Sequence, residues 1–270
     1  MPTKKPKIKV FRPKRKLPRD AASKPASSPP QAAVQAKLGP PSKLRGTNPE
    51  RVRQILEKLD ETYPNVTCAL EHRNPFELLI ATILSAQCTD VRVNIVTKTL
   101  FGKYRSPTDF AHANPADLEN EIRSTGFFRN KTKSIIGAAQ KLLKDFGGEV
   151  PRTMEELLTV PGAARKTANV VLGTAYKIAS GVVVDTHVQR LSQRLDLTHH
   201  GDPKKIEQDL IQIVPQDKWI LFSHQLIWHG RRVCVARNPR CADCNLERLC
   251  YSADKTVGWK LPAGKTGARR

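Results

Sequence analysis

The sequence predicts an all-α fold for the central part of the chain. Apolar residues recur there at the three- and four-residue spacing of one helix face, beginning with Val52, Ile55, Leu56 and Leu59. The β-like run Val182–Val184 is too short to build a sheet. Connections between the periodic segments are short, and the sequence shows no internal repeat. These observations favour packed helices over a sheet or a repeat array.

Polar residues followed by proline mark the start of four helices. Asn or Asp at the N-cap accepts hydrogen bonds from first-turn amides, and proline suits the next position because no N–H is needed there. The pairs are Asn48-Pro49, Asn74-Pro75, Asn114-Pro115 and Asp202-Pro203. Thr153 and Glu156 have the spacing of a capping box, and Gly147 stands where a helix would end in a left-handed residue.

Two further helices, Thr153–Thr159 and Arg165–Tyr176, are predicted on either side of a Pro-Gly turn. The apolar positions of the other predicted helices define the rest of an expected core. The expected core positions are Phe76, Leu79, Ile80, Ile83 and Leu84; Val91, Ile95 and Val96; Ile135, Ile136, Ala139, Leu142, Leu143 and Phe146; and Val188, Leu191 and Leu195.

Both ends of the chain are expected to be flexible. Residues 1–47 are rich in Lys, Pro, Ala and Ser and show no sustained period, which predicts a disordered tail. Within them, Arg12–Lys16 could serve as a nuclear import signal or as part of an arm that tethers DNA. Residues 253–270 are predicted to form a second loose tail.

Positive charge extends along the whole chain, which has a net charge of +21. Residues 1–47 hold thirteen Lys and Arg against a single acid, Asp20, and the remainder is basic as well. Nucleic acid is the simplest partner for such a chain. A membrane surface is disfavoured because no amphipathic basic helix stands out, and no apolar run is long enough to span a bilayer. The N-terminus lacks the apolar segment of a secretory signal, so we expect the six cysteines to lie in a reducing compartment.

Four of the cysteines form the most selective motif. Cys234, Cys241, Cys244 and Cys250 follow the pattern C-x₆-C-x₂-C-x₅-C. Four thiolates this close in sequence predict a soft metal site, and a [4Fe–4S] cluster is favoured. Zinc is the rival, although structural Cys₄ zinc sites usually contain two C-x₂-C pairs, and unliganded thiols are the third interpretation.

Arginines flank the first two of these cysteines. They are Arg231, Arg232, Arg237 and Arg240. A loop held by a metal would present such side chains, Arg237 and Arg240 above all, to DNA phosphates. The alternative is an ordinary solvated surface.

The Pro-Gly turn and the helix start after it form a second candidate site. The amides at Gly162 and Ala164 and the side chain of Arg165 could grip a phosphate, because a helix N-terminus attracts anions. The same positive end disfavours a protonated amine, which is one way to keep Lys166 neutral and nucleophilic. Turns and helix-start lysines of this kind are also common without function, so the motif depends on support from elsewhere.

Four more polar or aromatic positions have two open interpretations each. Asp185 is either the N-cap of the next helix or a carboxylate held near Lys166, and these two roles are compatible. His187 could join it, although a structural histidine is the simpler interpretation. Gln87 in a polar loop could enter a base stack, and Phe127 beside basic residues could wedge between bases rather than pack in a loop.

Taken together, these motifs resemble the endonuclease III family of the helix-hairpin-helix DNA glycosylases. The resemblance runs from about Asn48 to Tyr251, and it rests on Leu84–Gln87, Pro161–Val171, Val184–His187 and the four cysteines. It implies a six-helix barrel lobe and an iron–sulfur lobe. These would comprise residues 73–185, with the helix-hairpin-helix at 153–176, and residues 48–72 plus 186–252.

The resemblance also implies an activity. Lys166 matches the catalytic lysine of that family, Asp185 the catalytic aspartate, and Gln87 and Phe127 the residues that fill or wedge the space left by a flipped nucleotide. The expected enzyme is a monomeric, bifunctional DNA glycosylase and apurinic/apyrimidinic (AP) lyase of base excision repair. It would act on double-stranded DNA with damaged pyrimidines or missing bases, in the cytoplasm at the nucleoid of a prokaryote or in the nucleus of a eukaryote.

Two alternatives and one departure from the family pattern remain. An adenine-mismatch glycosylase shares the cysteine spacing but needs a glutamate on the helix that holds Ala81–Leu84 here. A non-catalytic iron–sulfur protein that binds DNA is the second alternative. The departure is Ala164, where the family usually has glycine; alanine would cost about 1 kcal/mol or more there if the position needs a positive φ.

Overall fold

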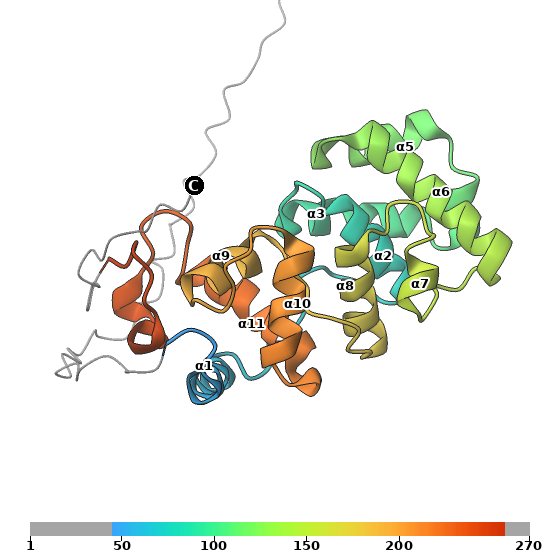
Figure 1. Ribbon diagram of the computed structural model, residues 1–270. Helices are drawn as coiled ribbons and strands as arrows, with labels where there is room; N and C mark the ends of the chain where they lie inside the picture. The colour runs from blue at the N-terminus through green and yellow to red at the C-terminus, as the bar shows by residue number, and fades with distance from the viewer. Residues whose placement is uncertain (1–44, 257–270) are drawn as a thin grey trace, which may run out of the picture. The chain divides into compact units, whose positions relative to one another are not determined.

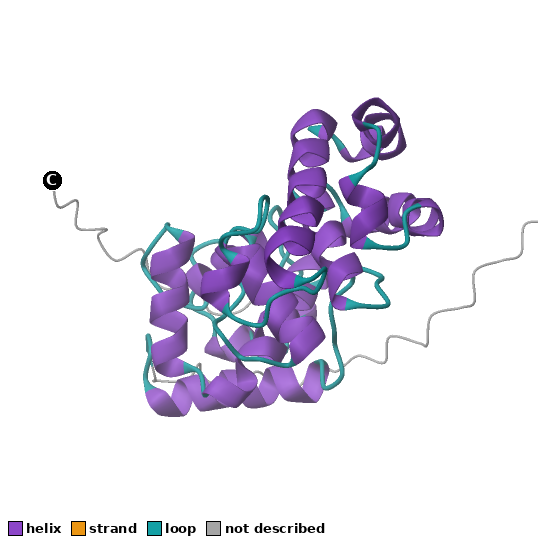
Figure 2. Cartoon of the chain, turned by 90° about the vertical axis from the view of Figure 1, so that its right-hand side faces the viewer, coloured by secondary structure: helices purple, strands orange, loops and turns teal. Residues whose placement is uncertain are grey.

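The computed structural model describes residues 45–256, which fold as helices joined by loops, without a strand in that range (Figures 1 and 2). The α-helices are α1 (Pro49–Thr62), α2 (Pro75–Leu84), α3 (Asp90–Lys103), α4 (Pro107–Ala111), α5 (Pro115–Ile122), α6 (Phe128–Phe146), α7 (Met154–Leu157), α8 (Arg165–Tyr176), α9 (Thr186–Arg194), α10 (Pro203–Ile213) and α11 (Trp219–Arg232). Short 3₁₀ helices are η1 (Arg123–Thr125), η2 (Gln216–Lys218), η3 (Cys241–Asp243) and η4 (Glu247–Leu249). The predicted all-α fold is confirmed.

The predicted helix starts are formed by the expected caps. The side chains of Asn48, Asn74, Asn114 and Asp202 each accept hydrogen bonds from first-turn amides, with proline following. Gly147 ends α6 in the left-handed conformation, with φ +60°. The capping box predicted at Thr153 forms only in part. Its hydroxyl accepts from the Glu156 amide, but the Glu156 carboxylate accepts from that hydroxyl instead of the Thr153 backbone amide.

One hydrophobic core is built around α2. Every residue from Phe76 to Leu84 is buried, because α2 packs against α8 on one side and against α3 and α6 on others. α6 carries Ile135, Ala139 and Leu142 into the same core. In Figure 1 these helices, drawn from teal to yellow, form one group.

A second core joins the two ends of the described chain. α1 packs against α11, and α9 packs against both α11 and α10 (Figure 1). Its buried residues include Leu59 from α1, Leu191 from α9 and Phe222 from α11. The chain therefore leaves this core after α1 and returns to it before α9.

The chain passes from one core to the other at positions that differ from the predicted lobe boundaries. Leu70 packs in the core around α2, although residues 48–72 were assigned to the other lobe. Val182 and Val184 pack in the core of α1 and α9–α11, although the barrel lobe was expected to run to Asp185. Each boundary depends on which distant partner buries an apolar residue, which local sequence does not specify.

The predicted buried face of α3 is wrong for two of its three residues. Val91 and Ile95 are 72% and 57% exposed, and only Val96 packs against the core, whereas Val93, Thr97 and Leu100 are fully buried. The buried stripe has helical spacing, but the polar Thr97 completes it. An assignment from apolar residues alone therefore selects the wrong side of the helix.

Order extends beyond the predicted limits at both ends. The Arg45 guanidinium lies 3.8 Å from the Tyr251 ring centroid. Asp254 pairs with Arg194, and Lys255 is buried, where it donates to the Glu247 carboxylate. The predicted C-terminal tail therefore does not begin at residue 253. The remaining tail predictions, for residues 1–44 with Arg12–Lys16 and for residues 257–270, lie outside the described residues.

Among the described helices, none is long and apolar enough to cross a membrane.

Candidate functional site

The Pro-Gly turn before α8 requires its glycine on two grounds. The turn closes through the Ala163 amide, which donates to the Val160 carbonyl at 3.0 Å. Gly162 has φ +81°, in the left-handed region that favours glycine. A Cβ there would also lie 2.9 Å from Cβ of Ser134 and 3.2 Å from Cδ1 of Ile83. The turn is thus pressed against α2 and α6.

Ala164 is unstrained. It is the N-cap of α8, with φ −73° and ψ 168°, an extended conformation that any residue adopts. The cost considered for alanine at this position therefore does not arise. Its side chain cannot cap the helix, and no side chain caps α8, whereas Asn, Asp or Thr side chains cap α1, α2, α3, α5, α9 and α10. The first amides of α8 are therefore available to an external acceptor.

Lys166 is the second residue of α8 and is exposed. Within residues 45–256 no carboxylate pairs with its amine. The amine is thus carried on a rigid helix, next to the uncapped amides, and open to an approaching ligand.

Arg165 is held within the protein. Its guanidinium donates twice to the Glu207 carboxylate, from Nε at 2.7 Å and from Nη2 at 3.0 Å. Asn169 donates to the same carboxylate at 2.9 Å, and Ser180 donates to Asn169. These bonds raise the pKa of Arg165. The start of α8 is therefore fixed to α10, and this side chain is committed there.

Glu207 and Asn169 were not identified from the sequence. Glu207 lies on the buried side of α10 with Ile206 and Leu210, and its side chain is 5% exposed. A carboxylate at a position that faces a core needs a buried partner. The helical periodicity of α10 places Glu207 among core positions, so it indicates that a buried partner exists. It does not indicate that the partners are Arg165 and Asn169.

Asp185 is the N-cap of α9. Its Oδ1 accepts hydrogen bonds from the amides of His187 and Val188, both at 2.8 Å. Within the described residues, Oδ2 has no such bond. The segment before it is fixed, because the Val183 amide donates to the Ser223 hydroxyl at 3.0 Å. The capping interpretation is confirmed, and it leaves one carboxylate oxygen for another partner.

His187 has the structural surroundings that the simpler interpretation expects. It is half-buried, and burial lowers its pKa. Nη2 of Arg190 lies 3.2 Å from its Nδ1 and also donates to the carbonyls of Gly230 and Cys234. α9 is in this way tied to the loop that carries the first of the four cysteines.

Gln87 and Phe127 share an unusual backbone. Both side chains are exposed, Phe127 to 61%, and their φ angles are +53° and +48°. A side-chain-bearing residue in this region is strained by on the order of 1–3 kcal/mol and persists only where surrounding structure imposes it. Gln87 precedes α3, and Phe127 is the N-cap of α6.

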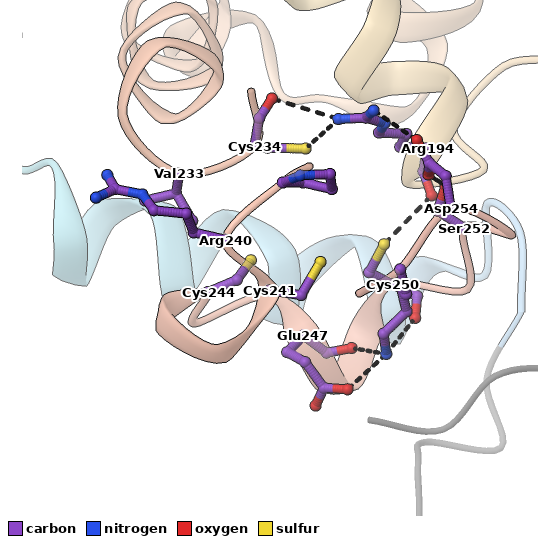
Figure 3. Close-up of a pocket in the computed structure, with 12 residues that line it drawn as sticks. Arg194, Val233, Cys234, Arg240, Cys241, Cys244, Glu247, Cys250, Ser252 and Asp254 are labelled. Carbon is purple, nitrogen blue, oxygen red and sulfur yellow. Dashed lines mark hydrogen bonds and ion pairs between the residues drawn. The ribbon is translucent and has the colours of Figure 1, made fainter. Parts of the chain in front are cut away.

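The four cysteines line one cavity, together with Arg194 and Glu247 among others. Figure 3 shows the sulfurs of Cys234, Cys241, Cys244 and Cys250 gathered around it, and none is in a disulfide. Burial raises the pKa of Cys244 to about 12 and also raises that of Cys250. Within residues 45–256 no three His, Cys, Asp or Glu side chains are placed to hold a single metal ion.

The flanking arginines divide into two pairs. Arg231 forms an ion pair with Asp90, and the Arg232 guanidinium lies 4.1 Å from the Trp228 ring centroid. Arg237 and Arg240 are exposed, and Figure 3 shows Arg240 directed away from the cysteines. The predicted phosphate contacts therefore rest on Arg237 and Arg240.

Comparison with known proteins gives the family. A family model described as HhH-GPD superfamily base excision DNA repair protein matches residues 80–216. Endonuclease III of Synechocystis sp. is 55% identical over 204 residues, which is 76% of this chain and 93% of that protein. Endonuclease III of Bacillus subtilis is 44% identical, covering 77% and 95%, and that of Escherichia coli K12 is 38% identical, covering 75% and 95%.

The chain belongs to the endonuclease III family. The resemblance drawn from the sequence motifs is thereby confirmed. Two solved structures agree, a non-covalent endonuclease III–DNA complex and a trapped endonuclease III–DNA covalent intermediate. Each has a TM-score of 0.72 and 44% identity, and covers 75% of this chain and 95% of its own. A thermostable thymine-DNA glycosylase, with a TM-score of 0.68 and 21% identity, shares the fold.

Proposed function

We propose that this member of the family is a bifunctional DNA glycosylase and AP lyase that acts on damaged pyrimidines in double-stranded DNA, with Lys166 as its nucleophile. The observation that carries the proposal is the exposed Lys166 on the second position of a helix whose first amides have no side-chain cap. These amides would bind a DNA phosphate and bring the sugar to the amine.

The reaction follows from the chemistry of an amine. The neutral Lys166 amine attacks C1′ of the deoxyribose, and the C1′–N bond breaks as the base departs. Loss of the ring oxygen from C1′ then gives an iminium. The iminium acidifies the C2′ proton, and removal of that proton expels the 3′ phosphate by β-elimination. The trapped covalent intermediate of a 44% identical endonuclease III supports a covalent route.

We assign Asp185 the electrostatic role. Its Oδ1 is bound by two backbone amides at the start of α9, where the positive end of the helix dipole meets the carboxylate. Oδ2 would accept a proton from the attacking amine or balance positive charge that develops on the sugar. Its rigid N-cap geometry would keep the carboxylate in place during the reaction.

DNA would be held by contacts of two kinds. The α8 amides, with Gly162 and Ala164 in the turn, and the exposed Arg237 and Arg240 would contact phosphates without reading sequence. Gln87 and Phe127 would enter the duplex where the damaged nucleotide leaves the stack. Arg165 would act indirectly, because Glu207 already binds its guanidinium.

The four cysteines fit a [4Fe–4S] cluster. Four half-buried thiols line a single cavity, and burial disfavours the ionisation of Cys244 and Cys250, so a cationic centre would stabilise the thiolates there. Cys234, Cys241, Cys244 and Cys250 would hold the cluster. When bound, it would supply cross-links that fix the loop presenting Arg237 and Arg240.

The proposal is tested by borohydride reduction during turnover on duplex DNA with an abasic site. The unmodified chain should form a covalent protein–DNA adduct, and Lys166→Gln should bind the same DNA but form none. Lys204→Gln is the matched control, since Lys204 is also exposed at the second position of its helix, α10. Absence of the adduct, or an adduct that survives Lys166→Gln, would contradict the lysine assignment.

A strand-nicking assay on the same abasic duplex separates this enzyme from a non-catalytic DNA-binding protein. A panel of single-lesion duplexes, with an adenine mismatch included, gives the preferred base. We expect the protein to be a monomer. It would act at the nucleoid of a prokaryote or in the nucleus of a eukaryote.

A further inference from the structure

The two strained residues proposed to enter DNA lie on separate stretches of chain. Gln87 follows α2 by three residues, and Phe127 follows η1 by two. α3, which begins just after Gln87, packs against η1. A pair of residues that must enter one duplex together needs a fixed mutual position. This inference rests on the proposed role of Gln87 and Phe127.

A buried lysine joins the two stretches. Nζ of Lys131 donates to the Leu84 carbonyl, at the last residue of α2, and to the Thr125 carbonyl, at the last residue of η1, both at 2.8 Å. The backbone just before Gln87 and the backbone just before Phe127 are thus bound to the same nitrogen atom.

Core packing does not explain the choice of lysine here. Lys131 is 5% exposed and lies in the first turn of α6, where a cation meets the positive end of the helix dipole. Burial lowers its pKa. No carboxylate of residues 45–256 pairs with it. An apolar side chain of similar length would fill the space without burying a charge.

We propose that Lys131 is a positioning residue that fixes the Gln87 and Phe127 loops relative to each other for joint insertion into duplex DNA. Its two hydrogen bonds hold both loops in their left-handed conformations. Without them, each loop relaxes separately, and the duplex must order both loops at the moment of binding.

The test is Lys131→Met, which keeps the length of the side chain and removes the donors. The matched control is Thr132→Val, because Thr132 is equally buried on the same helix and its hydroxyl has no hydrogen-bond partner. Insertion is followed by 2-aminopurine opposite an abasic site in duplex DNA, since unstacking raises its fluorescence. Chemistry alone is followed by cleavage of a single-stranded abasic oligonucleotide, where no stack has to be opened.

Lys131→Met should lower kcat/KM on duplex abasic DNA and the rate of the fluorescence change by roughly tenfold to a hundredfold, the effect of losing one or two charge-assisted hydrogen bonds. Cleavage of the single strand should change less than about threefold, and Thr132→Val should change neither readout. In the Gln87→Ala/Phe127→Ala background, Lys131→Met should have little further effect on duplex DNA, because the loops it positions no longer insert.

Equal losses on duplex and single-stranded DNA would overturn the proposal, as would a fluorescence change like that of Thr132→Val. Lys131→Gln, which keeps two donors on a shorter side chain, serves if Lys131→Met does not fold, and is expected to be intermediate. Failure of both variants to fold would also reject the positioning role, in favour of a purely structural one. The proposed function fails separately, if the unmodified chain cuts neither substrate or if Gln87→Ala/Phe127→Ala leaves insertion unchanged.

Discussion

Gly162 and Ala164, two residues apart in the turn before α8, carry different conformational demands. Gly162 has a positive φ and no room for a Cβ, while Ala164 is extended and has no side-chain bond to lose. A family preference for glycine at both positions therefore has a steric reason at only the first. The substitutions Gly162→Ala and Ala164→Gly separate the two.

We expect Gly162→Ala to destabilise the chain by about 1–3 kcal/mol and to weaken binding to abasic DNA, because the turn must shift away from Ser134 and Ile83. Ala164→Gly should change stability by only a few tenths of a kcal/mol, because the advantage of glycine at an N-cap is offset by its larger loss of conformational freedom on folding. Urea unfolding and DNA binding by fluorescence anisotropy measure both effects. A large gain in affinity from Ala164→Gly would show that alanine does obstruct the phosphate contact.

The bounds of single helices follow from the sequence, but their buried faces and their distant partners follow only in part. α8 begins at Arg165 and ends at Tyr176 as predicted, because a tight turn and apolar periodicity act locally. α3 was found, but its buried face was not, since Thr97 completes the buried stripe. Bonds such as Arg165–Glu207 join residues 42 positions apart, so no local pattern reveals them.

At the element scale, Glu207→Gln tests whether the link to α10 orients α8. The variant keeps hydrogen-bonding capacity but leaves the half-buried Arg165 without its counter-charge. We expect a loss of roughly 1–3 kcal/mol in stability and slower borohydride trapping at Lys166. Glu57→Gln is the control, because its ion pair with Arg53 is solvent-exposed and contributes little to stability. Unchanged trapping in Glu207→Gln would show that Lys166 does not depend on this link.

At the scale of the whole molecule, cationic side chains tie the cysteine loop into the second core. The fully buried Arg51 of α1 donates to the carbonyls of Leu195 and Leu249. Arg194 of α9 donates to Sγ of Cys234 at 3.2 Å and to nearby carbonyls. The sequence predicts that the four cysteines lie together, and they line one cavity, because their spacing is local. It did not identify these arginines, whose partners are far away in the chain.

Loss of the proposed cluster should therefore loosen one core and spare the other. We expect Cys244→Ser to lose the visible absorbance of an iron–sulfur centre. Amide exchange should become faster in α1 and α9, because Arg51 of α1 and Arg194 of α9 bind the cysteine loop. Amides of α2 and α6, which do not bind that loop, should stay protected. Cys68→Ser should keep the colour and the exchange pattern, since Cys68 packs against the core around α2 and lies outside the cavity. Hydrogen exchange with mass spectrometry resolves the two cores. Uniform loss of protection in α2, α6 and α9 would mean that the cores unfold as one unit and that the cysteine loop stabilises the whole described chain.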